Sequence, residues 1–310
     1  MRALRWAGVA LALPAAAAVG LWRLQREEPL PPGLAGKVVF VSDRDGLDAL
    51  YLRPLPAGPA RRLLTVAEPA RQPALAPDGR RLAFVLGGRI ALTDLERGGL
   101  EVLTLGVDRR DSQPSWSPDG RSLVVASRKV AESNSDVHLL SLDQKAGAEA
   151  ARRALTVTPG LDESEPVFAP DGQFVVFVRE DNLVRLALSD GRAQRLTGGF
   201  RRVRQPRFRG DGRLLCLWSQ EKLFGLDLMD ADGRNRETLS SGSTCWRTLA
   251  PAPDGRHLVA TFSYDLRFHW RDVLKLRATE ELRLLDERGA PVGVLERSLR
   301  HSNHSPQWGH

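Results

Sequence analysis

The segment Pro114-Ser-Trp-Ser-Pro-Asp-Gly120 decides the fold of this chain, because variants of it recur four more times. The variants are Pro73-Ala-Leu-Ala-Pro-Asp-Gly79, Pro166-Val-Phe-Ala-Pro-Asp-Gly172, Pro206-Arg-Phe-Arg-Gly-Asp-Gly212 and Leu249-Ala-Pro-Ala-Pro-Asp-Gly255. Their aspartates lie 41, 52, 40 and 43 residues apart, and each copy precedes a short apolar run such as Leu123–Ala126. A period of about 40–45 residues built from short strands is typical of the four-stranded blades of a β-propeller.

The chemistry of the Pro-Asp-Gly segment explains its place in the repeat. Proline fixes φ at the first turn position, aspartate accepts hydrogen bonds from the backbone two residues on, and glycine takes positive φ. Each copy is therefore predicted to join the inner strand of a blade to a second strand that is buried on both faces. A second series of turns should separate the third strand from the outer strand, and it has six members: Leu55–Gly58, Leu95–Gly98, Leu142–Gly147, Leu188–Gly191, Met229–Gly233 and Leu285–Gly289.

The two ends of the repeat region complement each other. Lys37–Gly46 has the pattern of a second strand without a first, and Ser305–Trp308 that of a first strand that stops at its turn. Joined, they would make one more blade and leave no open sheet edge. The predicted fold class is therefore all-β: a six-bladed β-propeller over residues 37–310, closed by pairing of the N- and C-terminal strands.

The N-terminal segment has the composition of an export signal. Residues 6–22 hold no charged side chain and lie between Arg5 and Arg23. We predict a signal peptide or an N-terminal membrane anchor helix over residues 1–22, followed by a Pro-rich linker over residues 23–36. Both readings place the propeller in the periplasm or cell envelope. Without cleavage, residues 6–22 would tether it to the inner membrane.

Composition excludes several classes of protein. The chain has 310 residues, 42% hydrophobic and 27% charged, which are values of a globular protein. Its two cysteines, Cys216 and Cys245, exclude a disulfide scaffold, and we do not expect them to pair. The net charge of +7 favours acidic partners only weakly.

Sequence motifs of catalysis are absent from the chain. There is no Gly-x-Ser-x-Gly, His-Glu-x-x-His, phosphate-binding Gly-Lys-Ser/Thr or dinucleotide-binding glycine motif. We therefore predict no enzymatic activity, no cofactor and no metal. His301, His304 and His310 could bind a metal but lack a matching carboxylate. Asp43-x-Asp45-Gly46-x-Asp48 suggests a calcium loop, although the same residues are ordinary turn formers.

The pattern Pro-x-aromatic-Ser-Pro-Asp-Gly resembles the repeat of TolB-type propellers, also called WD40-like propellers. Ser-Asp-Arg-Asp-Gly at 42–46 and Met-Asp-Ala-Asp-Gly at 229–233 look like that family's other turns. The resemblance covers about residues 37–310 and implies a propeller that binds an envelope protein. It is to the propeller alone, since TolB itself has an α/β domain ahead of it and this sequence has only the signal or anchor and the linker.

The loops that lead from each outer strand to the next inner strand are expected to ring the mouth of the central channel. Four of them carry Gln or Glu directly before the proline. Six such loops would form either a partner-binding rim or simply a solvated one, and we favour binding. The predicted binding residues are Arg71, Gln72, Asp111, Gln113, Glu163, Glu165, Arg204, Gln205, Arg207, Arg247 and His304.

Two stretches depart from the repeat. Phe200–Arg209 contains five arginines, which suit an acidic protein segment or lipid headgroups. Nucleic acid is not expected as a partner, because no aromatic residues alternate with the arginines for stacking on bases. Ser263–Glu281 is longer than the matching turns and includes Tyr264, Phe268 and Trp270. We expect it to form an extended hairpin or a small helix.

The function that these features predict is non-enzymatic binding of a protein or peptide of the bacterial cell envelope by a monomeric propeller. Two alternatives stay open. One is a propeller enzyme of the lactonase or lyase type with a metal in the channel, which would need His or carboxylate ligands that point into it. The other is a purely structural scaffold within a membrane complex.

Overall fold

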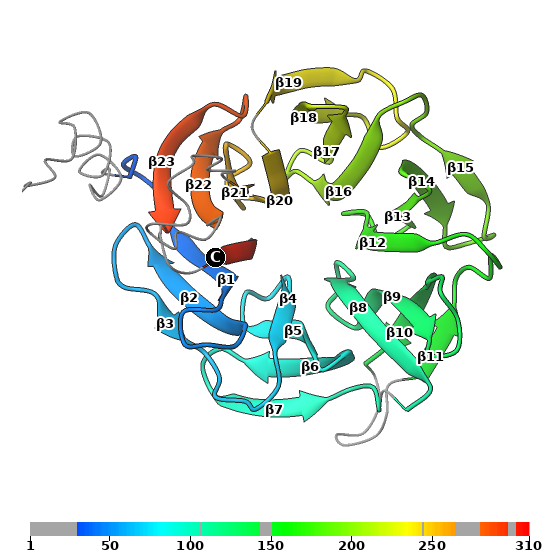
Figure 1. The fold of residues 1–310 in the computed structure, drawn as a ribbon, viewed down its shortest axis with the longest axis horizontal. Coiled ribbons are helices and arrows are strands. Elements are labelled where there is room, and N and C mark those ends of the chain that lie inside the picture. Colours follow the sequence, from blue (N-terminus) through cyan, green and yellow to red (C-terminus); the bar gives the residue numbers. More distant parts are fainter. Residues whose placement is uncertain are drawn as a thin grey trace, which may run out of the picture.

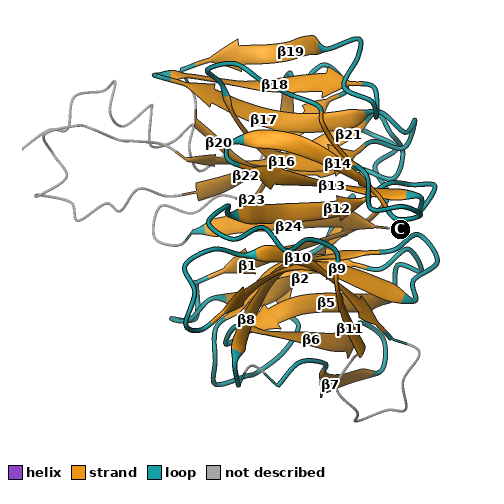
Figure 2. Ribbon diagram, turned by 90° about the vertical axis from the view of Figure 1, so that its right-hand side faces the viewer, coloured by secondary structure: helices purple, strands orange, loops and turns teal. Residues whose placement is uncertain are grey.

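The computed structural model describes residues 30–105, 107–142, 151–243, 245–263, 280–296 and 302–309. In these residues 24 strands form six antiparallel sheets of four strands each, and the sheets stand side by side in a ring (Figure 1). The six-bladed propeller predicted from the repeats is confirmed. Viewed from the side, the strands run between the two faces of a thick disc, and the connecting loops lie on those faces (Figure 2).

Five blades are continuous in the sequence. In order from the innermost strand outward, blade one is β4 (Ala70–Leu75), β5 (Arg81–Leu86), β6 (Arg89–Asp94) and β7 (Gly98–Val102). Blade two is β8 (Arg109–Trp116), β9 (Ser122–Lys129), β10 (Asp136–Ser141) and β11 (Ala151–Ala154). Blade three is β12 (Glu163–Phe168), β13 (Phe174–Arg179), β14 (Asn182–Ala187) and β15 (Ala193–Arg195). Blade four is β16 (Arg202–Phe208), β17 (Leu214–Gln220), β18 (Leu223–Met229) and β19 (Glu237–Gly242), and blade five is β20 (Cys245–Pro251), β21 (His257–Ser263), β22 (Glu280–Asp286) and β23 (Pro291–Glu296).

The sixth sheet, the composite blade, joins the two ends of the propeller. Its inner strand is β24 (Asn303–Gly309), followed outward by β1 (Gly36–Ser42), β2 (Ala49–Leu55) and β3 (Arg61–Arg62). β24 pairs antiparallel with β1, with Trp308 opposite Val38 and His304 opposite Val41. The predicted closure by terminal strands is confirmed.

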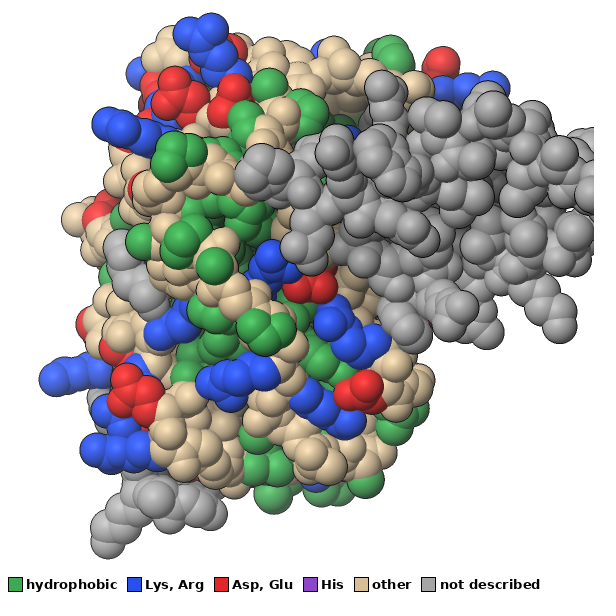
Figure 3. All heavy atoms as spheres, turned by 90° about the vertical axis from the view of Figure 1, so that its left-hand side faces the viewer, with side chains coloured by type: hydrophobic (Ala, Val, Ile, Leu, Met, Phe, Trp, Pro, Cys, Tyr) green, Lys and Arg blue, Asp and Glu red, His purple; other side chains and the backbone are tan. Residues whose placement is uncertain are grey.

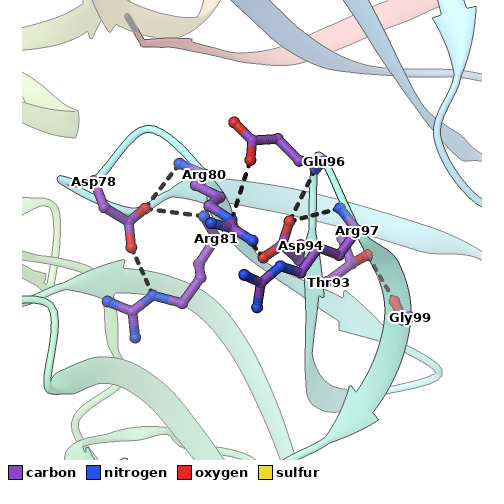
Figure 4. A network of polar contacts seen from close by, with 8 residues as sticks. All are labelled: Asp78, Arg80, Arg81, Thr93, Asp94, Glu96, Arg97 and Gly99. Atoms are coloured by element: carbon purple, nitrogen blue, oxygen red, sulfur yellow. Dashed lines mark hydrogen bonds and ion pairs between the residues drawn. The ribbon is translucent and has the colours of Figure 1, made fainter.

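The Pro-Asp-Gly turns have the predicted chemistry in all five copies. In blade one the Asp78 carboxylate accepts hydrogen bonds from the backbone N–H groups of Arg80 (2.8 Å) and Arg81 (2.9 Å), and from the Arg81 guanidinium (2.7 Å) (Figure 4). The aspartates of the other copies accept from the N–H group two residues on, at 2.8–3.1 Å. In blade two, hydrogen bonds from the Ser117 hydroxyl and the Arg121 N–H group lower the pKa of Asp119. All of these turns lie on one face of the disc, here called the Pro-Asp-Gly face.

The hydrophobic core is divided among the contacts between neighbouring blades. No strand of a blade buries more residues than its second strand; β13, for example, buries every residue from Phe174 to Val178. Phe177 is fully buried in a cluster with Val124 of the preceding blade. Burial of each such side chain stabilises the fold by about 1.5–3 kcal/mol, so each blade is stabilised chiefly by its neighbours.

The closure between β1 and β24 is reinforced by arginines. Arg44, in the turn after β1, donates hydrogen bonds to Glu296 at the end of β23 (3.1 Å) and to Asn303 in β24 (3.0 Å). Arg53 of β2 donates to the same glutamate (2.9 Å). Figure 3 views the side of the ring where β2, β3 and β23 lie, and basic side chains there lie beside acidic ones. The composite blade is thus fastened to blade five as well as to itself.

The residues just before β1 pack on the propeller. Leu34, within the predicted linker, is 3% exposed and joins the apolar cluster of the composite blade and blade five. Leu30 packs against the same cluster. The predicted signal or anchor over residues 1–22 lies outside the described residues, as does most of Ser263–Glu281. Within the described part of the chain, no helix has the length and apolar character to cross a membrane.

Candidate functional site: the central channel

Each inner strand contains a β-bulge, and the bulges organise the channel. The pairing of β4 with β5 shifts register between Arg71 and Ala74, and β8, β12, β16 and β24 shift at equivalent places. In β20 the shift lies slightly earlier, between Trp246 and Thr248. In five of the six strands one residue of the bulge has positive φ: Gln72 (50°), Gln113 (54°), Glu165 (55°), Gln205 (54°) and Ser305 (51°). A bulge redirects side chains locally.

This finding corrects the predicted position of these residues. They were expected in loops at the channel mouth, but they lie within β4, β8, β12, β16, β20 and β24. Each inner strand begins before its bulge. The connecting loop that leads to it therefore ends earlier in the chain than the repeat suggests. Cys245 likewise belongs to the start of β20 instead of the preceding loop.

Four of the bulge residues form a chain of hydrogen bonds from blade to blade, here called the polar girdle (Gln72, Gln113, Glu165 and Gln205). The side-chain oxygen of Gln72 accepts from the backbone N–H group of Gln113 at 2.9 Å, and that of Gln113 accepts from the N–H group of Glu165 at 2.8 Å. The Glu165 carboxylate accepts from the N–H group (2.5 Å) and the side-chain amide (2.8 Å) of Gln205. The Gln or Glu before the proline in blades one, two and three therefore holds the next blade in place.

A cavity of about 730 Å³ extends from the polar girdle to the Pro-Asp-Gly face. Its wall combines prolines of the repeat, such as Pro114 and Pro253, with aromatic residues, among them Trp116, Phe208 and Trp308. A volume of this size is that of a ligand site. The surface of the cavity is about equally polar and apolar, because Gln, Glu, Arg, Ser and Thr side chains line it together with the prolines and aromatic residues. The cavity is the candidate functional site.

Arg207 is the charged side chain of the cavity that lacks an acidic partner within ion-pairing distance among the described residues. Its guanidinium donates to the backbone oxygen of Pro206 (2.8 Å) and to the side-chain oxygen of Gln205 (3.2 Å). Burial lowers the pKa of Arg207, and the charge of Glu165 opposes this effect. Arg209, which also lines the cavity, pairs with Asp211 instead.

Two predicted binding residues are buried in the sheets. Asp111 is 1% exposed, and its two oxygens accept from the two terminal nitrogens of Arg152 at 3.0 and 2.7 Å. Glu163 is fully buried and pairs with Arg179 at 2.6 Å. Buried carboxylates need such partners, and removing one partner is strongly destabilising. In this structure both residues link strands within a blade, and neither lies at the channel mouth.

The remaining predicted residues lie toward the face opposite the Pro-Asp-Gly turns: Arg71, Arg204 and His304 lie before the bulge, and Arg247 lies at the bulge of β20. Arg71 pairs with Asp48, and Arg204 pairs with Asp181 at 2.5 Å; both acids belong to the preceding blade. Arg247 pairs with Glu280 at 3.1 Å. His304 is half-buried, with its Nδ1 3.0 Å from the Ser305 hydroxyl. Arg204 and Arg207, both predicted binding residues of the arginine-rich stretch, therefore lie on opposite sides of the bulge.

The acidic turn residues, the histidines and the cysteines that the sequence offered as metal ligands or disulfide partners form neither kind of site among the described residues. Asp43 accepts from the backbone N–H group of Ser302 (2.7 Å), and Asp45 accepts from Tyr51 and Arg62. Both carboxylates thus bond to other parts of the composite blade and to the residue before β24. His301 and His310 lie outside the described residues, and within those residues no three His, Cys, Asp or Glu side chains gather as metal ligands. Cys216 and Cys245 are both free thiols, and burial raises the pKa of Cys216 to about 12.

A ring of six four-stranded blades around a central channel defines a six-bladed β-propeller. Residues 108–287, more than half of the chain, match the family described as PD40, the TolB beta propeller domain. The chain therefore belongs to the TolB β-propeller family, as its repeats predict.

Individual relatives agree with this assignment. The chain is 32% identical over 152 residues to a protein TolB homolog of Chlorobium luteolum, a match that covers 46% of this chain and 31% of the relative. It thus spans about a third of the length of that relative. The crystal structure of TolB from Acinetobacter baumannii has the same fold, with a TM-score of 0.72 and 18% identity over 90% of this chain and 68% of that one.

The fold is shared with an enzyme as well. An oligogalacturonate lyase in complex with manganese superposes with a TM-score of 0.61 and 15% identity, covering 83% of this chain and 73% of the lyase. At this identity the likeness shows the fold alone. The lining of the cavity offers one carboxylate of the polar girdle, Glu165, and no histidine among the described residues. That donor set does not fit a metal held by several protein ligands.

Proposed function

We propose that the chain is a non-enzymatic, monomeric propeller of the bacterial cell envelope that binds a protein or peptide in its central channel. The observation that carries the proposal is the cavity of about 730 Å³ between the polar girdle and the Pro-Asp-Gly face. It has the size of a ligand site, and its lining mixes prolines and aromatic residues with polar side chains, among them Arg207, which has no acidic partner within 4 Å in the described residues. An extended segment of a partner fits this shape.

The proposal moves the binding site from the predicted rim to the channel itself. Gln72, Gln113 and Gln205 contribute indirectly, because they fix the floor of the cavity and keep the blades in register. Membership of the TolB β-propeller family supports an envelope role, and the charge-free segment at 6–22 supports export. That the partner is a protein or peptide of the cell envelope is likewise part of the proposal.

Site-specific photo-crosslinking in the native host tests this function. A photoreactive amino acid is placed at Ser115, which lines the cavity, and as a matched control at Ser241, which is exposed on the outer strand β19. We expect an adduct with one partner at Ser115 and none at Ser241. The absence of an adduct at Ser115, or equal adducts at both positions, would contradict binding in the channel.

A second measurement addresses the enzyme alternative and the location. Metal analysis of the purified protein is expected to find no stoichiometric calcium, zinc or manganese, whereas one bound ion per chain would favour a lyase-type enzyme. Cell fractionation should recover the protein from the periplasm or the inner membrane. The intact mass of the mature chain then decides between cleavage and retention of residues 1–22.

A further inference from the structure

Arg207 places a positive charge in the cavity at a position that is uncharged in the other blades. The position after the proline, or its equivalent, is Ala74, Ser115, Val167, Ala250 and Gln307 in the other blades. The repeat therefore tolerates small and neutral side chains there, and the arginine is not required by the turn or the sheet. A charged side chain at this one position calls for an explanation by binding.

The hydrogen bonds of Arg207 leave most of its donors unused. A guanidinium has five N–H groups, and protein acceptors engage one on each terminal nitrogen: the Pro206 carbonyl and the Gln205 amide oxygen. Both acceptors are neutral. Among the described residues no carboxylate lies within 4 Å of Arg207, although its neighbours Arg204 and Arg209 each have one.

Glu165 is the carboxylate whose charge acts on Arg207, but both of its oxygens already accept hydrogen bonds from another residue. Its two oxygens accept from the backbone and side-chain nitrogens of Gln205 and so belong to the polar girdle. Its attraction for Arg207 is felt only through space. The same Gln205 side chain donates to Glu165 and accepts from Arg207, which fixes the guanidinium above the girdle at the floor of the cavity.

We propose that Arg207 binds a carboxylate of the partner peptide, with the prolines and aromatic residues of the cavity wall holding the residues around it. This inference rests on the proposed function and specifies its ligand: an extended, apolar or proline-rich segment that carries an acidic side chain or ends in a free carboxyl group. Arginine suits this role because its planar fork matches both oxygens of a carboxylate. The prolines, Phe208 and the edges of Trp116 and Trp308 supply the apolar contacts.

Short synthetic peptides test this inference directly on the full-length protein. The probes are proline- and aromatic-rich peptides in four forms: with a free C-terminus, with a C-terminal amide, and with either Glu or Gln at internal positions. We expect binding to wild type, measured by fluorescence polarisation, from forms with a carboxylate at one of these places. The comparison of the free C-terminus with internal Glu identifies the source of the carboxylate.

The decisive variant is Arg207→Gln, which keeps the size and polarity but removes the charge. We expect it to weaken binding of carboxylate peptides about tenfold to a hundredfold, since a hydrogen bond to a charged group contributes about 1.5–3 kcal/mol, and to leave the amide and Gln forms unchanged. Arg204→Gln is the matched control on the same strand and should bind like wild type. Arg207→Glu should instead prefer peptides in which Lys replaces Glu, a reversal that loss of folding could not produce.

The outcomes separate this inference from the function on which it rests. If wild type binds peptides and Arg207→Gln binds carboxylate and amide forms equally well, the inference fails and channel binding stands. If Arg204→Gln loses as much affinity as Arg207→Gln, the carboxylate is bound on the other side of the bulge and the inference again fails. If wild type binds none of the peptides while the crosslinking at Ser115 also finds no partner, both proposals fall.

Discussion

The two sides of the ring hold neighbouring blades together in different ways. From blade one to blade four, a Gln or Glu on each inner strand bonds to the backbone of the next inner strand. At blade five and the composite blade the equivalent residues are Thr248 and Ser305, and the ring is held there by the pairing of β24 with β1. The girdle contains several similar hydrogen bonds, so the ring can lose one of them and keep the others. The pairing of β24 with β1 occurs once, and no other contact replaces it. This difference predicts unequal costs for disturbing the two sides.

The largest effect is expected from removing the closing strand. A chain that ends at Ser302 lacks β24, exposes the apolar face of β1 and loses Trp308, which is 8% exposed. Truncating one buried Trp or Phe costs about 3–5 kcal/mol, so loss of the whole strand should exceed the stability of a typical domain. We expect insoluble or protease-sensitive protein, assayed by limited proteolysis and circular dichroism.

A milder variant and a rescue keep this prediction testable. Trp308→Ala should fold with stability reduced by about 3–5 kcal/mol, measured by urea unfolding. A synthetic peptide covering residues 303–310, added to the truncated chain during refolding, should restore protease resistance. Wild-type stability of the truncated chain would show that closure contributes little.

The stability of the side of the ring that contains the polar girdle, blades one to four, should be the more sensitive to acid. The cause is His138 on β10 of blade two. Burial lowers the pKa of His138 from 6.5 to about 4, aided by the positive charges of Arg152 and Arg109 and opposed by Asp111 and Asp136. The unfolded chain therefore takes up a proton near pH 6.5, while the folded chain resists until about pH 4. Stability from this group is complete above pH 6.5 and is lost as the pH falls to 4, by about 3 kcal/mol.

Two measurements check this acid sensitivity. The stability difference between pH 7 and pH 4.5, from urea unfolding, should shrink by about 2–3 kcal/mol in His138→Gln, because the variant has no group to titrate there. Hydrogen exchange at the lower pH should accelerate first in β9–β11 of wild type. An unchanged pH dependence in the variant would mean that other groups cause the loss.

The sequence predicts the fold well because its signals are local. Pro-Asp-Gly specifies a turn by the conformational preferences of its own residues, and five copies in phase define the blades. The bulges are different: a residue before proline ordinarily has negative φ, yet Gln72, Gln113 and Glu165 take positive φ. Packing of the ring imposes this conformation, and the conformational preferences of Gln and Glu before proline do not predict it. The polar girdle was therefore visible in the sequence as a pattern, but not as a set of bonds between blades.

The site residues illustrate the same limit. Asp111 appeared as a rim residue because its partner Arg152 lies 41 positions further on, in an outer strand whose pairing the repeat does not specify. Arg204 and Arg207 belong to one arginine-rich stretch and are three positions apart, and only the bulge between them reveals that they face different sides. Arg207 could have been singled out from the sequence, since it is the charged member of a position that is otherwise small or neutral.

The smallest effect is expected within the polar girdle, where one link can be cut without opening the ring. Gln113→Ala removes the acceptor for the Glu165 N–H group and should cost about 1 kcal/mol, because that donor lies at the floor of the cavity and water can reach it. Gln113→Glu should restore the loss, since Glu165 shows that a carboxylate serves in this position. Ser305→Ala, at the equivalent place on the closing strand, should change stability by less than about 0.5 kcal/mol. Urea unfolding of the three variants measures these differences; an equal loss in Ser305→Ala and Gln113→Ala would contradict the division of the ring into a girdled and a closed side.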